Sequence, residues 1–220
     1  MRAKIAGTFE GIQGEGIYTG IKQVFIRFYG CNLSCKFCDT RLNSYREFDL
    51  GELLKRIRSF DINYHSISLT GGEPLLQSDF LVKFLPKLKK KLYLETNGTL
   101  PEKLNQIIDQ IDIVAVDIKI PSSTGLKDFW NEHIKFLEIA SKKEVFIKAV
   151  VCKSTKLEDI KKTIKLVADF NKDIPFILQP NSFEMEKGLI KRLIYFQNLC
   201  CHYLSYVRII PQMHKFLGLK

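Results

Sequence analysis

The stretch VFIRFYGCNLSCKFCDT, residues 24–40, joins an apolar run typical of a buried strand to a loop that holds three cysteines. Cys31, Cys35 and Cys38 have the spacing Cys-x3-Cys-x2-Cys, and no fourth cysteine lies beside them. Three thiolates could bind three irons of a four-iron cluster and leave one iron open, whereas structural clusters usually have four protein thiolates. The alternatives are zinc with three protein ligands and a water, or packing alone.

Outward from this loop, short apolar runs alternate with segments of helical periodicity. Further strands are predicted at residues 66–69, 92–95, 113–119, 145–151, 176–179 and 207–210. Helices are predicted between them at residues 50–58, 80–89, 102–108, 129–140, 157–170 and 187–203. Apolar strands rich in Val and Ile, each followed by a helix, indicate parallel βα units covered by helices. About six such units predict an α/β fold, a partial (open) (βα) barrel.

Polar motifs follow most of these strands. They are GCNLSCKFC (30–38), TGGEP (70–74), ETNG (95–98), DIKIPSS (117–123) and QPNS (179–182). In barrels of parallel strands, the active site forms at the carboxyl ends of the strands. We therefore expect these motifs to meet at one rim and to form one site. Taken singly each motif is weak, because paired glycines and Asn-Gly are also common in ordinary turns.

The composition is that of a globular protein, and without repeats or a linker it predicts one domain over residues 1–220. No apolar run is long enough to span a bilayer, and the N-terminus turns polar too early for a signal peptide. We expect a cytoplasmic protein that uses its clustered cysteines for metal binding or catalysis, with Cys152, Cys200 and Cys201 as buried structural thiols. The net charge of +10 is spread in short lysine runs, which favours a solvated surface over a nucleic-acid site.

The cysteine spacing, with Phe37 before the last cysteine, resembles that of the radical S-adenosylmethionine (radical SAM) superfamily. The resemblance implies that the amino and carboxylate groups of S-adenosylmethionine chelate the open iron. An external electron donor would start cofactor cleavage, and the resulting 5′-deoxyadenosyl radical would abstract hydrogen from the substrate. TGGEP resembles the segment that holds the methionine amino group. Cofactor binding is assigned to Phe37, Cys38, Asp39, Gly72, Glu95, Asn97, Lys119, Ser122 and Gln179.

The glycine-rich segment GIQGEG, residues 11–16, precedes the cysteines. Its Gln13 and Glu15 could form a polar surface turn, or could present amide and carboxylate edges to a planar heterocycle. Arg27 alternates with apolar residues inside a strand, where a charge is costly unless it is paired. We expect Arg27 to recognise a ligand carboxylate. The alternative is a partly exposed arginine at the end of the strand.

Together, IQGEG (12–16), the cysteine segment, TGGEP and a terminal VRIIPQMH (207–214) resemble the 7-carboxy-7-deazaguanine synthase family over nearly the whole chain. The resemblance implies a lyase of queuosine and deazapurine biosynthesis. Such a lyase converts 6-carboxy-5,6,7,8-tetrahydropterin to 7-carboxy-7-deazaguanine, with loss of ammonia by a radical ring contraction. The resemblance also implies a 4Fe-4S cluster, S-adenosylmethionine, Mg²⁺ and a homodimer.

By position, this resemblance makes Cys31, Cys35 and Cys38 the cluster ligands. It makes Thr40 the magnesium ligand, which agrees with the preference of Mg²⁺ for hard oxygen. A capping segment at residues 207–220 would close the site, and no residue is assigned a catalytic role. The predicted pterin site consists of Ile12, Gln13, Gly14, Glu15, Arg27, Thr70 and His214.

Two other functions remain open from the sequence. An activase that installs a glycyl radical on a partner enzyme would share the cysteines and TGGEP, but it has no need of IQGEG or Arg27. A zinc or iron–sulfur protein that binds nucleic acid would instead use the net charge of +10. Analysis of iron, acid-labile sulfide and zinc would separate this last function from the other two.

Overall fold

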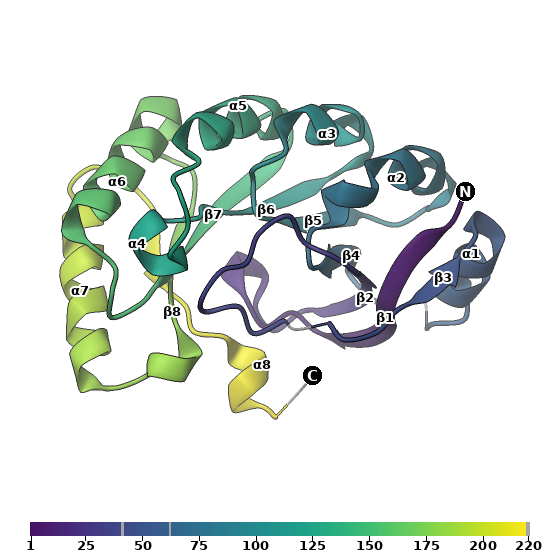
Figure 1. Ribbon diagram of the computed structural model, residues 1–220, viewed down its shortest axis with the longest axis horizontal. Helices are drawn as coiled ribbons and strands as arrows, with labels where there is room; N and C mark the ends of the chain where they lie inside the picture. The colour runs from purple at the N-terminus through teal and green to yellow at the C-terminus, as the bar shows by residue number, and fades with distance from the viewer. Residues whose placement is uncertain (41, 62, 219–220) are drawn as a thin grey trace.

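The computed structural model describes residues 1–40, 42–61 and 63–218, and in these it contains one nine-stranded sheet (Figure 1). The strand order is β3-β1-β2-β4-β5-β6-β7-β8-β9. The strands are β1 (Ala3–Ile12), β2 (Lys22–Phe28), β3 (Arg46–Phe48), β4 (Ser66–Gly71), β5 (Leu92–Thr96), β6 (Ile113–Asp117), β7 (Glu144–Val151), β8 (Phe176–Pro180) and β9 (Val207–Ile209). Pairings from β2 to β9 are parallel, whereas β1 is antiparallel to β2 and β3. The described sheet has β3 and β9 as its edges and is therefore open, as predicted.

Helices cover the outer face of this curved sheet (Figure 1). They are α1 (Leu50–Arg58), α2 (Ser78–Phe84), α3 (Pro101–Asn105), α5 (Trp130–Ala140), α6 (Leu157–Asn171) and α7 (Lys187–Cys201). Two short helices, α4 (Pro121–Thr124) and α8 (Met213–Phe216), are not part of this outer layer. α1 begins with a capping box, in which the side chains of Asp49 and Glu52 each accept a hydrogen bond from the other's backbone N–H. The predicted βα architecture is confirmed.

The strand β1 is the main element that the periodicity did not predict. Its sequence, AKIAGTFEGI, is interrupted by Gly7 and Gly11, and glycine weakens a strand pattern. β1 nevertheless pairs with β2 from Ile5 to Ile12. The glycine-rich segment that follows β1 enters the concave side of the sheet, where Tyr18 makes an edge contact with the ring of Tyr93 at 5.8 Å.

Two apolar clusters lie on opposite faces of the sheet. The larger fills the space between strands and helices, and from β2 it takes the fully buried Val24, Ile26 and Phe28. The smaller lies on the concave face and consists of Tyr93, Ile113, Ala115, Phe146 and Ile177, with Ile17 and Tyr18 packed against it. Gly16 has a φ of 68°, and a Cβ there would lie 2.5 Å from Phe146 Cζ, so the close approach requires glycine. This cluster forms an apolar floor on the concave side, and polar groups follow at the rim.

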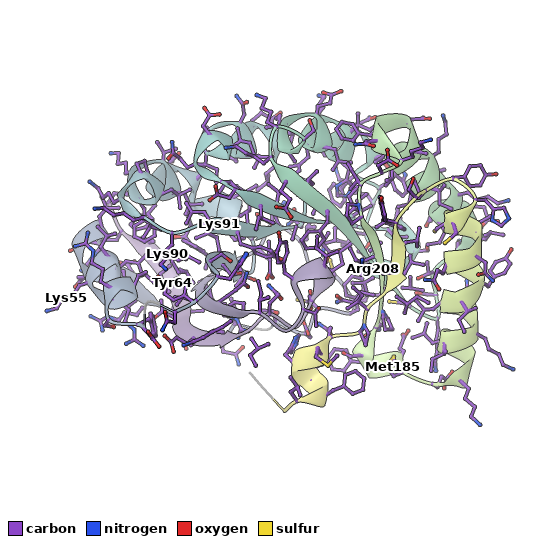
Figure 2. All side chains as sticks on the ribbon, turned by 180° about the vertical axis from the view of Figure 1, so that it is seen from behind. Lys55, Tyr64, Lys90, Lys91, Met185 and Arg208 are labelled. Atoms are coloured by element: carbon purple, nitrogen blue, oxygen red, sulfur yellow. The ribbon has the colours of Figure 1, made fainter. Side chains whose placement is uncertain are left out.

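Basic side chains are dispersed over the surface. Figure 2 shows that Lys55 lies apart from Lys90 and Lys91 in the view from behind. Lys90 lies over the ring of Tyr64, with its ammonium 5.0 Å from the ring centre.

Two further predictions concern the remaining cysteines and membrane insertion. Cys152 and Cys200 are buried, as predicted. The same prediction is wrong for Cys201, which lies on the exposed side of α7 at its last residue. Over the residues described, no helix is long and apolar enough to cross a membrane.

Candidate active site

The three clustered cysteines lie in the loop that follows β2, at the concave side of the sheet (Figure 1). Two backbone hydrogen bonds hold this loop: Lys36 N donates to Thr124 O over 3.0 Å, and Cys38 N donates to Cys35 O over 3.1 Å. Partial burial raises the pKa of the Cys31 and Cys35 thiols. These two groups are therefore neutral thiols near pH 7 until a metal displaces their protons.

The TGGEP motif at the end of β4 ties the cysteine loop to neighbouring strands. Gly72 N donates to Phe28 O over 3.0 Å, and Glu73 N donates to Gly30 O over 2.8 Å. A Cβ at Gly72 would lie 2.6 Å from the Gly30 carbonyl carbon, so glycine is needed for this approach. The fully buried Glu73 carboxylate accepts hydrogen bonds from the ETNG segment, and burial raises its pKa to about 7.

A cavity of about 180 Å³ opens at this rim. Its lining includes nearly all residues assigned above to the cluster or the cofactor: Cys31, Cys35, Phe37, Cys38, Asp39, Gly72, Glu95, Asn97, Lys119 and Gln179. Ser122 is the exception. Its hydroxyl accepts a hydrogen bond from Lys156 N over 2.9 Å, so it contacts the segment after β7 rather than the cavity.

Two buried oxygens of this cavity, Asp117 Oδ1 and Gln179 Oε1, have no hydrogen-bond partner among the residues described. A buried acceptor without a donor is costly. These oxygens therefore fit a ligand that brings donors, such as the amino and hydroxyl groups of S-adenosylmethionine. Lys119 Nζ pairs with Asp117 Oδ2 over 3.0 Å and lies 5.6 Å from the centre of the Phe37 ring. The cavity thus offers both a cation and free acceptors beside the cysteine loop.

The arrangement of the thiols bears on which metal they could hold. In the described part of the chain, no three side chains of His, Cys, Asp or Glu converge closely enough to hold one metal ion. A zinc site needs its ligands around a single ion, whereas a four-iron cluster places each thiolate on a different iron. The cysteine loop carries three thiols, the number that a cluster with one open iron requires.

A second cavity, of about 280 Å³, adjoins the first. Five residues line both cavities: Glu15, Asp39, Thr40, Thr70 and Glu95. The residues assigned to the pterin site all line the second cavity: Ile12, Gln13, Gly14, Glu15, Arg27, Thr70 and His214. The structure therefore places the two predicted sets of residues around two connected cavities, which are called the mouth below.

Arg27 lies on the concave face of β2, opposite the face that enters the larger core. Its guanidinium lies 5.1 Å from the centre of the Phe9 ring, which stacks on Phe25. Within the described residues, no carboxylate forms an ion pair with Arg27. A half-buried guanidinium without a protein carboxylate can bind a carboxylate of a ligand, for which its planar fork is suited.

Glu95, at the end of β5, stands between the two cavities. Its Oε1 accepts a hydrogen bond from Gln13 Nε2, and its Oε2 accepts one from Thr70 Oγ1, each over 2.8 Å. Gln13 is buried and also donates to Gln23 Oε1 over 2.9 Å. The backbone N of Glu15 donates to Gln13 Oε1 over 3.0 Å. The glycine-rich segment is therefore held in a buried polar network rather than in a surface turn.

The C-terminal segment bridges the glycine-rich segment and the end of the cysteine loop. Gln212 Nε2 donates to Glu15 Oε1 over 2.7 Å and to Asp39 Oδ2 over 2.8 Å. Lys215 Nζ pairs with Asp39 Oδ2 over 2.9 Å. Residues 219–220 of the predicted capping segment lie outside the described residues. The part that is described contacts the mouth on both sides.

Two charged residues of the mouth, Asp117 and Lys148, were given no role from the sequence, whereas Gln212 and Lys215 lie in the predicted capping segment without a role of their own. Asp117 precedes Lys119 by two residues at the end of a strand and so shares its face, a signal that could have found it. Lys148 lies within the apolar run of β7, where a lysine is costly unless it is paired. Gln212 belongs to the VRIIPQMH motif and Lys215 follows it, but no sequence pattern indicates that they contact Glu15 and Asp39.

The fold and the mouth define a protein of radical SAM type, and the sequence model of the Radical SAM superfamily matches residues 25–171. The chain is 41% identical to the 7-carboxy-7-deazaguanine synthase of Geobacter sulfurreducens, over 98% of this chain and 97% of that protein. It is 34% identical to the 7-carboxy-7-deazaguanine synthase of Methanothermobacter thermautotrophicus, over 100% of this chain and 99% of that protein. The chain belongs to the 7-carboxy-7-deazaguanine synthase family, and this membership implies a 4Fe-4S cluster and S-adenosylmethionine.

Solved structures share the fold. The crystal structure of QueE from Escherichia coli superposes with a TM-score of 0.65 at 22% identity, over 97% of this chain and 95% of that one. Archaeal TYW1 superposes with a TM-score of 0.54 at 13% identity, over 84% of this chain and 73% of that one. At these identities the likeness establishes the shared open-barrel fold alone.

Proposed function

We propose that this protein converts 6-carboxy-5,6,7,8-tetrahydropterin to 7-carboxy-7-deazaguanine with loss of ammonia, by a radical ring contraction in queuosine and deazapurine biosynthesis. The observation that carries the proposal is the pair of adjoining cavities. One is lined by the three cysteines, and the other presents Arg27, which forms no ion pair with any carboxylate of the described residues. A planar pterin that bears a carboxylate matches the second cavity and would lie beside the first.

In the first cavity, the chain would hold the cluster and orient the cofactor. Cys31, Cys35 and Cys38 would each bind one iron. Asp117 Oδ1 and Gln179 Oε1, which need donors, would accept hydrogen bonds from the cofactor. When bound, the cluster and S-adenosylmethionine supply an electron and a 5′-deoxyadenosyl radical. The chain must then keep water away from the mouth, a task suited to the C-terminal segment that crosses it.

In the second cavity, the polar edges match an aminopyrimidinone ring. Gln13, Glu15 and Glu95 present oxygen atoms to its amino and ring N–H groups. Arg27 would bind the carboxylate in a charge-assisted, two-point contact. Burial alone raises the pKa of Glu15, but the charge of Lys148 and the hydrogen bonds from Lys148 and Gln212 together outweigh burial and lower that pKa below its ordinary value. Glu15 therefore meets the substrate as an ionised acceptor.

Several parts of the proposal rest on the family resemblance. Thr40 would be the Mg²⁺ ligand, and its place at the boundary of the two cavities supports a metal that also contacts the substrate. The enzyme would act in the cytoplasm as a homodimer, as one domain over residues 1–220. An external donor would supply the electron that reduces the cluster.

The test is product formation by anaerobically reconstituted protein supplied with S-adenosylmethionine, a reductant, Mg²⁺ and the carboxylated pterin. We expect 7-carboxy-7-deazaguanine, and none from a Cys35→Ala control. Cleavage of the cofactor to 5′-deoxyadenosine without deazaguanine would instead support the glycyl-radical activase. Neither product, from protein whose iron and acid-labile sulfide contents show an intact cluster, would refute the proposal.

A further inference from the structure

We infer that Lys148 is a positioning residue that couples the binding of the pterin to the binding of S-adenosylmethionine. The inference rests on the proposed function, because it takes these molecules as the ligands of the two cavities. Lys148 lies on β7 and pairs with two carboxylates from different elements. One is Glu15 of the glycine-rich segment, and the other is Asp117 of β6, at 3.5 Å from Lys148 Nζ and directly opposite Lys148 in the strand register.

Lys148 belongs to a row of alternating charges across the mouth. Asp117 Oδ2 also pairs with Lys119, so the row runs Lys119, Asp117, Lys148, Glu15. The four side chains are only 11% to 17% exposed, and burial at this level requires that each charge have an opposite neighbour. Lys119 lies at the end of the row beside Phe37 of the cysteine loop. Glu15 lies at the other end, in the pterin cavity.

Each carboxylate of the row can meet a ligand while it pairs with Lys148. Asp117 Oδ1 is buried without a partner, and Asp117 Oδ2 faces the two lysines. Glu15 directs Oε2 at Lys148 and can accept a further hydrogen bond at that oxygen, while Gln212 and Gln179 donate to Glu15 Oε1. The ammonium group thus links two acceptors, one for each ligand. Without Lys148 the same two carboxylates would repel each other across a low-dielectric space.

This arrangement sets the sign of the coupling. A ligand that hydrogen-bonds to Glu15 fixes that carboxylate and, through it, the ammonium of Lys148. The fixed ammonium in turn orders Asp117, so the second ligand meets an acceptor that is already in place. Because the cost of ordering falls mainly on the first ligand, each ligand should tighten the binding of the other. Coupling between sites usually amounts to 5- to 150-fold, and for one shared ammonium we expect about tenfold in both directions.

The test measures dissociation constants rather than turnover. The enzyme is reconstituted and kept with its cluster oxidised, so that it does not turn over. Isothermal titration then gives the dissociation constant of S-adenosylmethionine with and without saturating pterin. It likewise gives the dissociation constant of the pterin with and without saturating S-adenosylmethionine. We expect about tenfold tightening in the wild type, less than about twofold in Lys148→Met, and partial retention in Lys148→Arg, which keeps the charge. The matched control is Lys142→Met, which removes an exposed lysine just before β7 and should keep the full effect.

Undiminished coupling in Lys148→Met would overturn the inference, as would a wild type that binds both ligands without coupling. If Lys148→Met does not fold, Glu15→Gln decides the matter, because it breaks the row with little change in shape and must also lose the coupling. Failure of the wild type to bind the pterin at all would refute the proposed function instead. The two failures are therefore distinguishable.

Discussion

Replacement of Gly72 by alanine tests how closely the cysteine loop must lie against the TGGEP motif. The added Cβ would clash with the Gly30 carbonyl oxygen and lie 2.6 Å from the carbonyl carbon, whereas ordinary contact begins at 3.4 Å, so the segments must separate by at least about 0.8 Å. That shift stretches the 2.8 Å hydrogen bond from Glu73 N to Gly30 O beyond hydrogen-bonding range. A lost hydrogen bond of about 1 kcal/mol and overpacking of about 1–3 kcal/mol give a total cost of about 2–4 kcal/mol.

The assay compares thermal unfolding of the apoproteins and then the iron content after reconstitution. In a chain of this length, Gly72→Ala should lower Tm by about 5–15 °C and reduce the iron retained, because the loop that carries Cys31 is displaced. Gly51→Ala is the matched control. Its Cβ would meet nothing nearer than 3.5 Å, and in helix α1 it should leave Tm unchanged or slightly raised. A Gly72→Ala protein with wild-type Tm and full iron content would refute the reasoning.

Three other perturbations give separate readouts. Arg27→Ala should weaken pterin binding about 10- to 100-fold by removing a charge-assisted contact, and leave cofactor cleavage partly intact; undiminished deazaguanine formation would contradict that role. Burial and the Lys119 ammonium lower the pKa of His133 to about 4, so below pH 6.5 the unfolded chain takes up a proton that the folded protein does not. As the pH falls from about 7.5 to 5, the wild type should therefore lose about 2 kcal/mol of unfolding free energy relative to His133→Asn, measured by urea titration. The same pH dependence in both proteins would disprove this. Lys215→Met removes a partly exposed ion pair with Asp39. It should lower Tm by less than about 4 °C and raise KM for the pterin. An unchanged KM would show that the ion pair with Asp39 does not shape the site.

The parallel part of the sheet could be predicted because its strands are buried on both faces and appear as continuous apolar runs, as at residues 113–119. β1 could not be predicted, since its glycines and partly exposed positions break the run and its partner lies across an antiparallel pairing. The predicted helix at 80–89 ends early, at Phe84. Pro86 lacks a backbone N–H and converts the last turn to a 3₁₀ helix.

Much of the mouth could be predicted because motifs at the ends of parallel strands must meet at one rim. The residues that pair with buried charges could not be predicted. The pair of Lys148 and Glu15 joins residues 133 positions apart, and no local pattern encodes such a contact. For Ser122, a sequence motif indicated the cavity although the side chain lies elsewhere. Its place in DIKIPSS suggests the cavity, but the turn of α4 brings its hydroxyl to the backbone of Lys156 instead.

On this account, the two cavities form one reaction chamber in which the cofactor radical reaches the pterin. The most direct measurement is deuterium transfer, in an anaerobic reaction with the carboxylated pterin deuterated at its ring carbons. Mass spectrometry would then be used to examine 5′-deoxyadenosine and recovered S-adenosylmethionine. We predict deuterium at the 5′ carbon of the adenosyl group, and much less of it with Arg27→Ala. Deazaguanine formed while the adenosyl group stays unlabelled would contradict the claim.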